Sequence, residues 1–142
     1  MRIKRVLFAA VVAAMLLTML ALPAMAEGDT AMWVSQVRLA WNGRSSSSSD
    51  RVVAMVHVRD ANLAAVDGAV VTAEWTLPDG EVLEATAVTD FQGIATFEVW
   101  EGGGAYALCV TDLAKAGWFY APELNIETCG GLLVKWPFDP KG

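Results

Sequence analysis

Residues 67–110 read DGAVVTAEWTLPDGEVLEATAVTDFQGIATFEVWEGGGAYALCV, and this stretch decides the fold class. It contains four short runs in which apolar and polar residues alternate, and turn residues separate the runs at near-regular spacing. The turns carry Asp-Gly, Asp-x-x-Gly and Gly-Gly-Gly sequences, which supply the positive φ angles that tight connections require. Such a series of short alternating strands is typical of an antiparallel β-sandwich.

Following the same alternation along the rest of the chain predicts seven strands, at 33–41, 51–59, 69–77, 81–88, 94–100, 105–112 and 132–136. We therefore expect an all-β domain, built as a seven-stranded antiparallel Greek-key sandwich. The weaker pattern and small side chains of 81–88 favour a position at a sheet edge. Residues 113–117 are expected to form one helical turn.

Three tryptophans in the predicted strands are assigned to a face by the alternation. Trp33 is expected on the same face as Val37 and Leu39. Trp75 is expected in the core. Trp100 falls on an outward face, where we expect it to be exposed, in an interface, or beside another aromatic ring.

The N-terminal residues 1–26 have the features of a secretory signal peptide. A basic start is followed by an apolar run from Val6 to Leu22 and by the small-x-small pair Ala24 and Ala26, after which we expect cleavage. An uncleaved membrane anchor is the alternative, because the apolar run approaches the length of a membrane span. The sequence thus predicts a secreted, extracellular or cell-envelope protein with no membrane span after cleavage.

Cleavage leaves 116 of the 142 residues, enough for one ordinary domain. We expect a lead-in at 27–32, a single β-sandwich domain at 33–136 and a tail at 137–142. This part keeps seven Lys and Arg and all sixteen Asp and Glu, which gives a formal net charge of −9. The negative charge disfavours nucleic acid and anionic membrane surfaces as partners, and it is compatible with an extracellular cation.

Both cysteines of the chain, Cys109 and Cys129, lie in the exported part. An even pair in a small exported domain usually forms a disulfide, and this one would close a loop of 20 residues. Two free thiols are the alternative. Neither cysteine belongs to a Cys-x-x-Cys pair, so redox or zinc chemistry is not indicated.

Four spaced motifs resemble those of known modules. They are Val56-x-Val58-x-Asp60, Val66-x-Gly68-Ala69-x-Val71, Thr89-Asp90-x-x-Gly93-x-Ala95-x-Phe97 and Gly104-x-Tyr106-x-Leu108-x-Val110. Over about residues 51–120 the chain resembles bacterial Ig-like modules and carboxypeptidase regulatory-like (transthyretin-like) domains. The resemblance implies a sandwich fold and a non-catalytic unit of the kind appended to secreted enzymes, adhesins and surface proteins.

If each connection reverses the chain direction, the loops after the second, fourth and sixth strands share one end of the sandwich. That end is expected to collect the acidic residues Asp60, Asp67, Asp90 and Asp112. Several carboxylates on neighbouring loops can bind Ca²⁺, and calcium is the only cofactor that the sequence suggests. The alternative is that these aspartates only stabilise β-turns, through side-chain bonds to the backbone two residues on.

The same end receives the aromatic loop Trp118, Phe119 and Tyr120. This loop is the candidate binding surface for a protein or glycan, because clustered exposed aromatic residues often mark contact sites. The alternative is that the three rings fold back and cap the end of the sandwich.

The chain offers little for catalysis. Its only histidine, His57, falls on the outward face of a predicted strand, and no serine lies in a nucleophile elbow. We therefore expect no enzyme activity, although a glycan hydrolase that uses two carboxylates remains a formal alternative.

The function expected from the sequence is that of a secreted, non-catalytic Ig-like domain, a binding or interaction module at the cell surface. One alternative is a structural subunit of an extracellular assembly, a homo-oligomer joined through the terminal strands around Trp33 and Trp136. Another is a carbohydrate-binding accessory domain.

Overall fold

The structure is a computed structural model and describes residues 30–43 and 50–135. The predicted signal peptide, the C-terminal tail at 137–142, the serine run at 45–49 and Trp136 lie outside the described residues.

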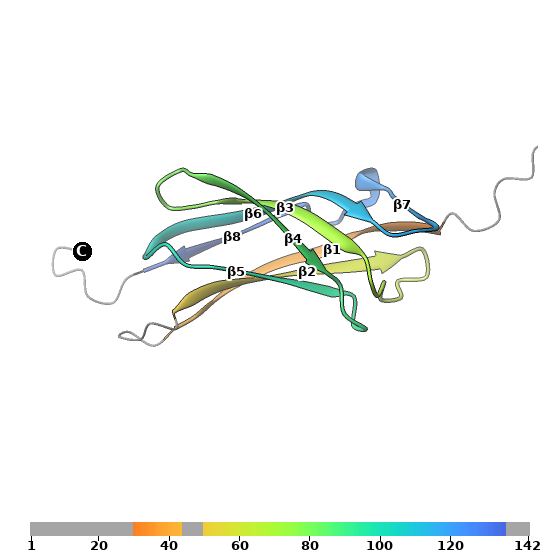
Figure 1. The fold of residues 1–142 in the computed structure, drawn as a ribbon, viewed down its shortest axis with the longest axis horizontal. Coiled ribbons are helices and arrows are strands. Elements are labelled where there is room, and N and C mark those ends of the chain that lie inside the picture. Colours follow the sequence, from red (N-terminus) through yellow and green to blue (C-terminus); the bar gives the residue numbers. More distant parts are fainter. Residues whose placement is uncertain (1–29, 44–49, 136–142) are drawn as a thin grey trace, which may run out of the picture.

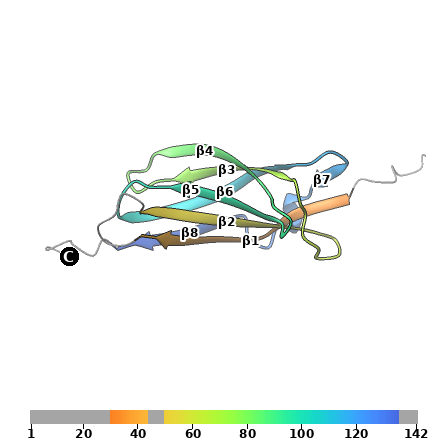
Figure 2. The ribbon, with the colours of Figure 1, turned by 60° about the horizontal axis from the view of Figure 1, so that its bottom comes forward.

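Two four-stranded sheets pack face to face (Figures 1 and 2). Sheet A has the order β5 (Ile94–Val99), β2 (Arg51–Asp60), β1 (Thr30–Asn42) and β7 (Trp118–Tyr120). Sheet B has the order β4 (Val82–Val88), β3 (Val70–Thr76), β6 (Gly104–Ala114) and β8 (Cys129–Val134). A short 3₁₀ turn, η1 (Pro122–Leu124), connects β7 to β8. The predicted all-β fold is confirmed, and the predicted edge position of residues 81–88 is confirmed by β4 at the end of sheet B.

The core lies between the sheets and is built from the alternate positions that the sequence predicts. Val52, Ala54, Val56 and Val58 of β2 are fully buried, as are Val71 and Ala73 of β3. Trp75 of β3 meets Tyr106 of β6 edge to face, with 6.5 Å between the ring centroids. Burial of these apolar side chains supplies the main driving force for folding.

The described residues form eight strands rather than seven, and the differences lie near the chain ends. β1 begins at Thr30, inside the predicted lead-in, and pairs in parallel with β7, which the sequence treated as a loop. β8 begins at Cys129 instead of Leu132. The predicted helical turn at 113–117 is wrong, because β6 continues to Ala114 and a turn follows it. All strand pairs except β1–β7 are antiparallel.

A β-bulge in β1 reverses the predicted orientation of Trp33. The register with β2 shifts between Val34 and Gln36, so Ser35 is the extra residue. Met32 and Val34 therefore join Val37 and Leu39 in the core. Trp33 lies in register with Arg59 on the opposite face of sheet A, since one inserted residue exchanges the two faces of a strand.

The free side of β1 is covered in an unusual way. Three residues of β1 pair with β7, and the segment 125–127 forms hydrogen bonds with the next part of the same edge. The Val34 N–H donates to Asn125 Oδ1 (2.9 Å), the Ile126 N–H donates to the Val34 carbonyl (2.9 Å), and the Val37 N–H donates to Glu127 Oε2 (2.8 Å). Two side chains thus supply acceptors that a neighbouring strand would normally provide.

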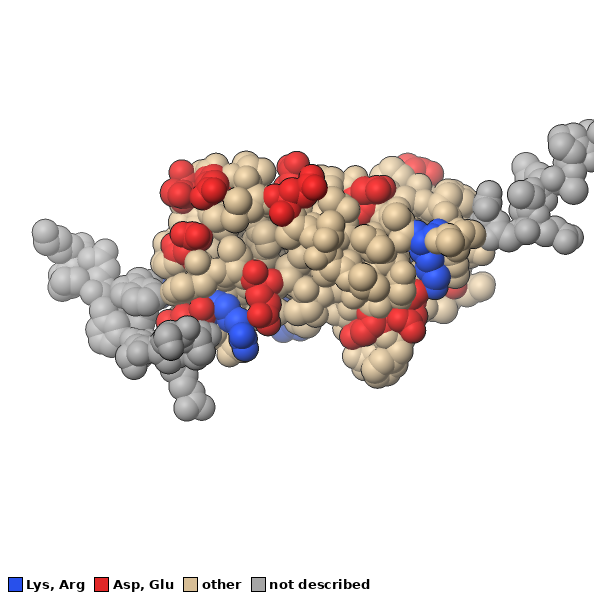
Figure 3. Space-filling model, in the orientation of Figure 1, with Lys and Arg blue, Asp and Glu red and all other residues tan. Residues whose placement is uncertain are grey.

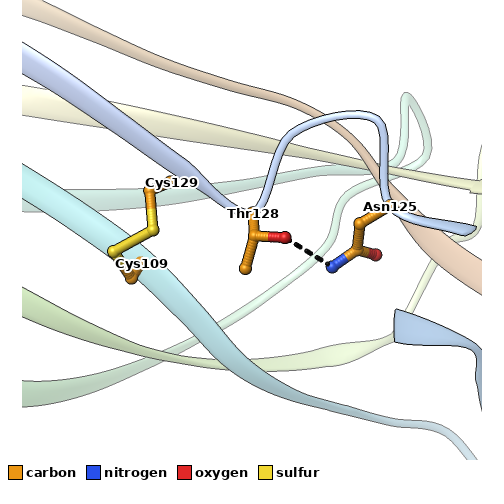
Figure 4. The surroundings of a disulfide bond; sticks show 4 residues. All are labelled: Cys109, Asn125, Thr128 and Cys129. Carbon is orange, nitrogen blue, oxygen red and sulfur yellow. Dashed lines mark hydrogen bonds between the residues drawn. A yellow bond between two sulfur atoms is a disulfide. The ribbon is translucent and has the colours of Figure 1, made fainter. Parts of the chain in front are cut away.

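The predicted disulfide is confirmed: Cys109 and Cys129 are bonded, and no described cysteine is free. They lie directly opposite each other on β6 and β8, so the bond joins two strands of sheet B (Figure 4). Thr128 is next to Cys129, and its hydroxyl oxygen accepts a hydrogen bond from Asn125 Nδ2 at 3.1 Å. This bond links the disulfide to the segment that covers β1. Within the described ranges, no helix is long and apolar enough to cross a membrane.

Candidate functional site

Three connections meet at one end of the sandwich, which we call the loop pole: residues 61–69, 89–93 and 115–117 (Figures 1 and 2). The Val58 N–H donates to the Gly93 carbonyl at 2.8 Å, and Arg59 Nη1 donates to the Gln92 carbonyl at 2.8 Å. Lys115 Nζ donates to the Asp67 carbonyl. The three connections that strand parity assigned to one end therefore do lie together.

Thr89 fixes the base of the loop pole. Its buried hydroxyl donates to the Val66 carbonyl at 2.6 Å and accepts from the Ala69 N–H at 2.8 Å. The Gly68 N–H also donates to the Thr89 carbonyl, at 3.0 Å. These bonds fix the backbone at the base of the two longer loops.

Two loops of the pole have the same internal structure. In the first, Asp60 Oδ1 accepts from the N–H groups of Asn62 and Ala64. In the second, Asp90 Oδ1 accepts from the N–H groups of Gln92 and Ile94. In each, the aspartate carbonyl also accepts from the N–H three residues on. The two aspartates therefore act as turn formers, the alternative that the sequence left open.

Counted from its aspartate, the fourth residue of each turn lies in the left-handed region, with φ 61° at Leu63 and 74° at Gly93. Gly93 is required, because a Cβ there would lie 2.7 Å from the Val58 carbonyl oxygen. Leu63 is the only non-glycine residue with positive φ among the described residues, and its side chain is 69% exposed. A branched apolar side chain in this conformation is strained and gains nothing from burial.

Leu63→Gly should therefore stabilise the protein. Removing the Cβ relieves about 1 kcal/mol of strain in the left-handed conformation. Part of this gain is lost, because glycine increases the conformational entropy of the unfolded chain. Chemical denaturation should show a higher midpoint at an unchanged slope. Leu63→Ala is the control, because alanine keeps the Cβ and should leave stability close to that of the wild type. A fall in stability for Leu63→Gly would show that the leucine side chain holds the loop.

Phe91 occupies the tip of the second loop and is 78% exposed, the most exposed of the large apolar residues described. Its loop is tied to the first loop by the Arg59–Gln92 bond, so Phe91 and Leu63 project from adjacent connections. Neither residue is among the binding residues predicted from the sequence. The sequence does carry a signal for both residues. Phe91 lies inside an Asp-x-x-Gly turn and Leu63 ends an Asp-x-x-Leu turn, and polar residues or glycine are usual in such turns.

The four aspartates proposed as calcium ligands do not converge. The side chains of Asp60 and Asp90 bind backbone N–H groups of their own loops, Asp67 is exposed, and Asp112 lies within β6 in register with Thr72. Among the described residues, no three His, Cys, Asp or Glu side chains are grouped closely enough to hold a metal ion. The structure therefore adds no support to the calcium hypothesis.

The aromatic segment at 118–120 divides between capping and exposure. Trp118 and Tyr120 are half-buried and pack against the core, and the Tyr120 hydroxyl accepts from Asn125 Nδ2 at 2.7 Å. Lys115 Nζ lies 5.0 Å from the Trp118 ring centroid, a cation–π distance. Phe119 faces outward from β7 and is exposed. Of the three candidate binding residues, only Phe119 is exposed, with 48% of its surface accessible.

Two tryptophan rings lie at the end of the sandwich opposite the loop pole. Trp41 and Trp100 stack with 6.5 Å between centroids and an interplanar angle of 10°. Both are half-buried and pack against the core. Trp100 is thus beside another aromatic ring, as expected from the sequence, but its expected exposure is wrong, because the ring packs against the core. The pair closes that end of the core.

The outer faces of the two sheets differ in charge. Arg38, Arg51 and Arg59 lie at outward positions of sheet A, where the Glu98 carboxylate is 3.5 Å from Arg51. The outward positions of sheet B carry Glu74, Glu84 and Asp112. Figure 3 shows a face on which Asp and Glu side chains are widely spread and Lys and Arg side chains are few.

His57 lies in the basic surroundings of sheet A. Its pKa is lowered from the ordinary value of 6.5, first because partial burial desolvates the ring, and then because Arg59 and Arg38 lie nearby; Asp90 acts in the opposite sense. The half-buried position on an outward face agrees with the sequence expectation. The Ser35 hydroxyl donates to the backbone carbonyl of His57 at 3.2 Å.

The lowered pKa of His57 predicts a pH dependence of stability. Between the folded-state pKa and about 6.5 the unfolded chain binds more protons, so acidification through this window should reduce the free energy of unfolding. NMR titration should place the imidazole pKa below 6.5, and Arg38→Gln should raise it. Arg51→Gln is the matched control and should leave it unchanged. A wild-type imidazole pKa above 6.5 would contradict the assignment.

Comparison with known proteins identifies no relative: no protein-family model matches the chain, and no curated protein or solved structure matches it significantly. The function therefore has to be argued from the residues themselves.

Proposed function

We propose that this protein is a secreted, non-catalytic interaction domain with an Ig-like fold, which binds a protein partner at the cell surface through the loop pole. The observation that carries the proposal is the exposure of Leu63 and Phe91 on two adjacent loops that are fixed by hydrogen bonds. Exposed apolar side chains held on a rigid framework lose little conformational entropy on binding, which favours affinity.

The strained backbone at Leu63 supports the same proposal. A glycine would fit this position at lower energy, as Gly93 shows in the equivalent loop. Strain at an exposed residue is a reason to suspect function, because folding alone does not require it. Leu63 offers an aliphatic side chain and Phe91 an aromatic ring, a combination suited to an apolar pocket in a protein partner.

Three features support the Ig-like assignment. The first, second and fifth strands share one sheet, and the third and sixth strands share the other, as in Ig domains. Trp75 is a buried tryptophan on the third strand. The Tyr106 hydroxyl, near the start of the sixth strand, donates to the Gly102 carbonyl (2.6 Å) and accepts from the Glu101 N–H (2.9 Å), the arrangement of a tyrosine corner. The disulfide departs from the Ig pattern, because it lies within sheet B instead of joining the sheets.

Secretion is supported by the N-terminal sequence and by the disulfide, since disulfides persist in oxidising compartments. Expression in a host with a secretory pathway, followed by mass spectrometry of the exported product, tests it. The expected N-terminus is Glu27. Retention of the full chain in the membrane fraction would favour an anchor.

Binding to isolated cell envelopes of the source organism tests the loop pole. Labelled protein that begins at Glu27 should bind saturably. The double variant Leu63→Ser, Phe91→Ser should bind about thirtyfold more weakly, since each lost apolar anchor costs on the order of 1 kcal/mol. Leu133→Ser is the matched control: it removes an equally exposed apolar residue from β8, outside the pole. Equal binding by all three proteins would exclude the pole as the contact surface.

A further inference from the structure

β4 is an open sheet edge whose one charged residue is Glu84. It ends sheet B, and five of its seven residues are exposed, including Val82 (56%) and Val88 (60%). The strand contains no proline, lysine or bulge, which are the usual means by which proteins protect an edge from pairing with another chain.

The direction of the backbone groups along β4 follows from its two ends. The Thr89 N–H donates to the Ala69 carbonyl, and the Leu77 N–H donates to the Glu81 carbonyl, so Thr89 and Glu81 both face β3. The register between them is unbroken, and consecutive residues of an antiparallel strand point to alternate sides. The N–H and C=O groups of Val82, Glu84, Thr86 and Val88 therefore point away from the sheet.

The other edges are less suited to pairing. β1 is covered by β7 and the segment 125–127, so the edge beside Trp33 is closed. β8 lies against β1, since a Cβ at Gly130 would be 2.5 Å from the Val37 carbonyl oxygen. The outward groups of β5 belong to Ile94, Thr96 and Glu98, but the N–H and C=O groups of Ile94 already bind Asp90. Two-fold pairing about Thr96 would also place Ile94 opposite a glutamate.

β4 has the sequence Val-Leu-Glu-Ala-Thr-Ala-Val, in which Val82 and Val88 lie at equal distances from Ala85. Two copies related by a two-fold axis at Ala85 would pair Val82 with Val88 and Glu84 with Thr86. All four outward residues then face one another as hydrogen-bonded pairs, and each exposed valine gains an apolar cross-strand neighbour. A two-fold axis makes the contact closed, so it produces a dimer and no open filament.

We propose that a second copy of this chain pairs with β4 about a two-fold axis at Ala85, which joins the two B sheets into one continuous antiparallel sheet. The surface involved is separate from Leu63 and Phe91, so the dimer does not depend on the proposed function. Two dimer partners would carry two loop poles, and a bivalent module binds a surface more tightly than a single copy does.

One charge opposes the dimer. Glu84 lies directly opposite Glu74 on β3. In the dimer, the Glu84 residues of the two copies would be diagonal neighbours across the new strand pair, roughly 7–8 Å apart. Like charges at such positions weaken strand pairing, and salt screens them. Glu84→Gln should therefore strengthen dimerisation about threefold or more, and raised ionic strength should act in the same direction.

Sedimentation velocity on protein beginning at Glu27, over a concentration series reaching about 1 mM, measures the dimer directly. Thr86→Pro should weaken association about tenfold or more, because proline removes an N–H that points outward and leaves the bonds to β3 intact. Thr96→Pro is the matched control, an exposed threonine with an outward N–H on the β5 edge, and it should leave the dimer unchanged. Circular dichroism and thermal unfolding verify that both variants remain folded.

Cross-linking tests the register. Ala85→Cys should form an intermolecular disulfide on air oxidation, because the two Ala85 residues face each other at the axis, whereas Thr86→Cys should not, because its counterpart is Glu84. A protein that stays monomeric throughout the concentration series overturns the proposal. A dimer that the Thr86→Pro substitution leaves intact also overturns it. So does a dimer in which Thr86→Cys, and not Ala85→Cys, forms the intermolecular disulfide.

Discussion

Replacing Cys109 and Cys129 together with alanine should lower the free energy of unfolding by about 3 kcal/mol, the entropy that closure of a 20-residue loop removes from the unfolded chain. Domains of this size are stable by only about 5–15 kcal/mol, so the change is a large fraction of the total. The disulfide also holds β8 on β6, and its loss frees the segment that covers β1. Urea denaturation of the two proteins measures the difference.

Reductant provides the control for this prediction. Dithiothreitol should shift the denaturation midpoint of the wild type to that of the double variant, and it should have no effect on the variant. A wild type that is indifferent to complete reduction would contradict the argument.

Gly130→Ala should destabilise the protein by about 1–3 kcal/mol, the range found for overpacked positions. A Cβ at this position would lie 2.5 Å from the Val37 carbonyl oxygen and 2.9 Å from Val37 Cγ1, so β8 would have to move away from β1. The two sheets meet at this contact, and a shift there opens the side of the core. Thermal unfolding of the purified variant measures the loss.

Gly131→Ala is the matched control, on the next residue of the same strand. Its Cβ would meet only the Tyr106 carbonyl oxygen, at 3.5 Å, an ordinary contact. We expect little change, or a small gain because alanine restricts the unfolded chain. Equal losses for the two variants would show that β8 tolerates no side chain for another reason.

Much of the fold could be predicted from local sequence, because apolar and polar residues alternate with a period of two from Val71 to Thr76 and give β3 one apolar face. The bulge at Ser35 could not be predicted, since nothing in the sequence near Trp33 shows which residue will be left out of the pairing. The β1–β7 pair was missed for a similar reason: its partners lie far apart in the chain, and three aromatic residues give no alternation to read. Cys109 and Cys129 were paired correctly because the chain offers no other choice.

The candidate site was predicted in position but not in composition. Strand parity brought the connections of the loop pole together, because parity depends only on the number of strands. The side-chain bonds of Asp60 and Asp90 are local, but the bonds of Thr89 join loops that are 20 or more residues apart, which local patterns do not reveal. The sequence predicts Trp118 and Tyr120 as binding residues because they are aromatic, but their rings pack against the core.

The placement of β1 and β8 has a mechanical consequence. β1 begins at the loop pole, where Met32 is in register with Asp60, and β8 ends at the opposite end, where Val134 is in register with Gly104 (Figure 1). Tension applied to Thr30 and Val134 would run along the strands, so the ladder bonds would carry the load together in shear instead of opening one after another. A domain loaded in this way resists extension, and it would act as a stiff link in any tether of which it formed a part.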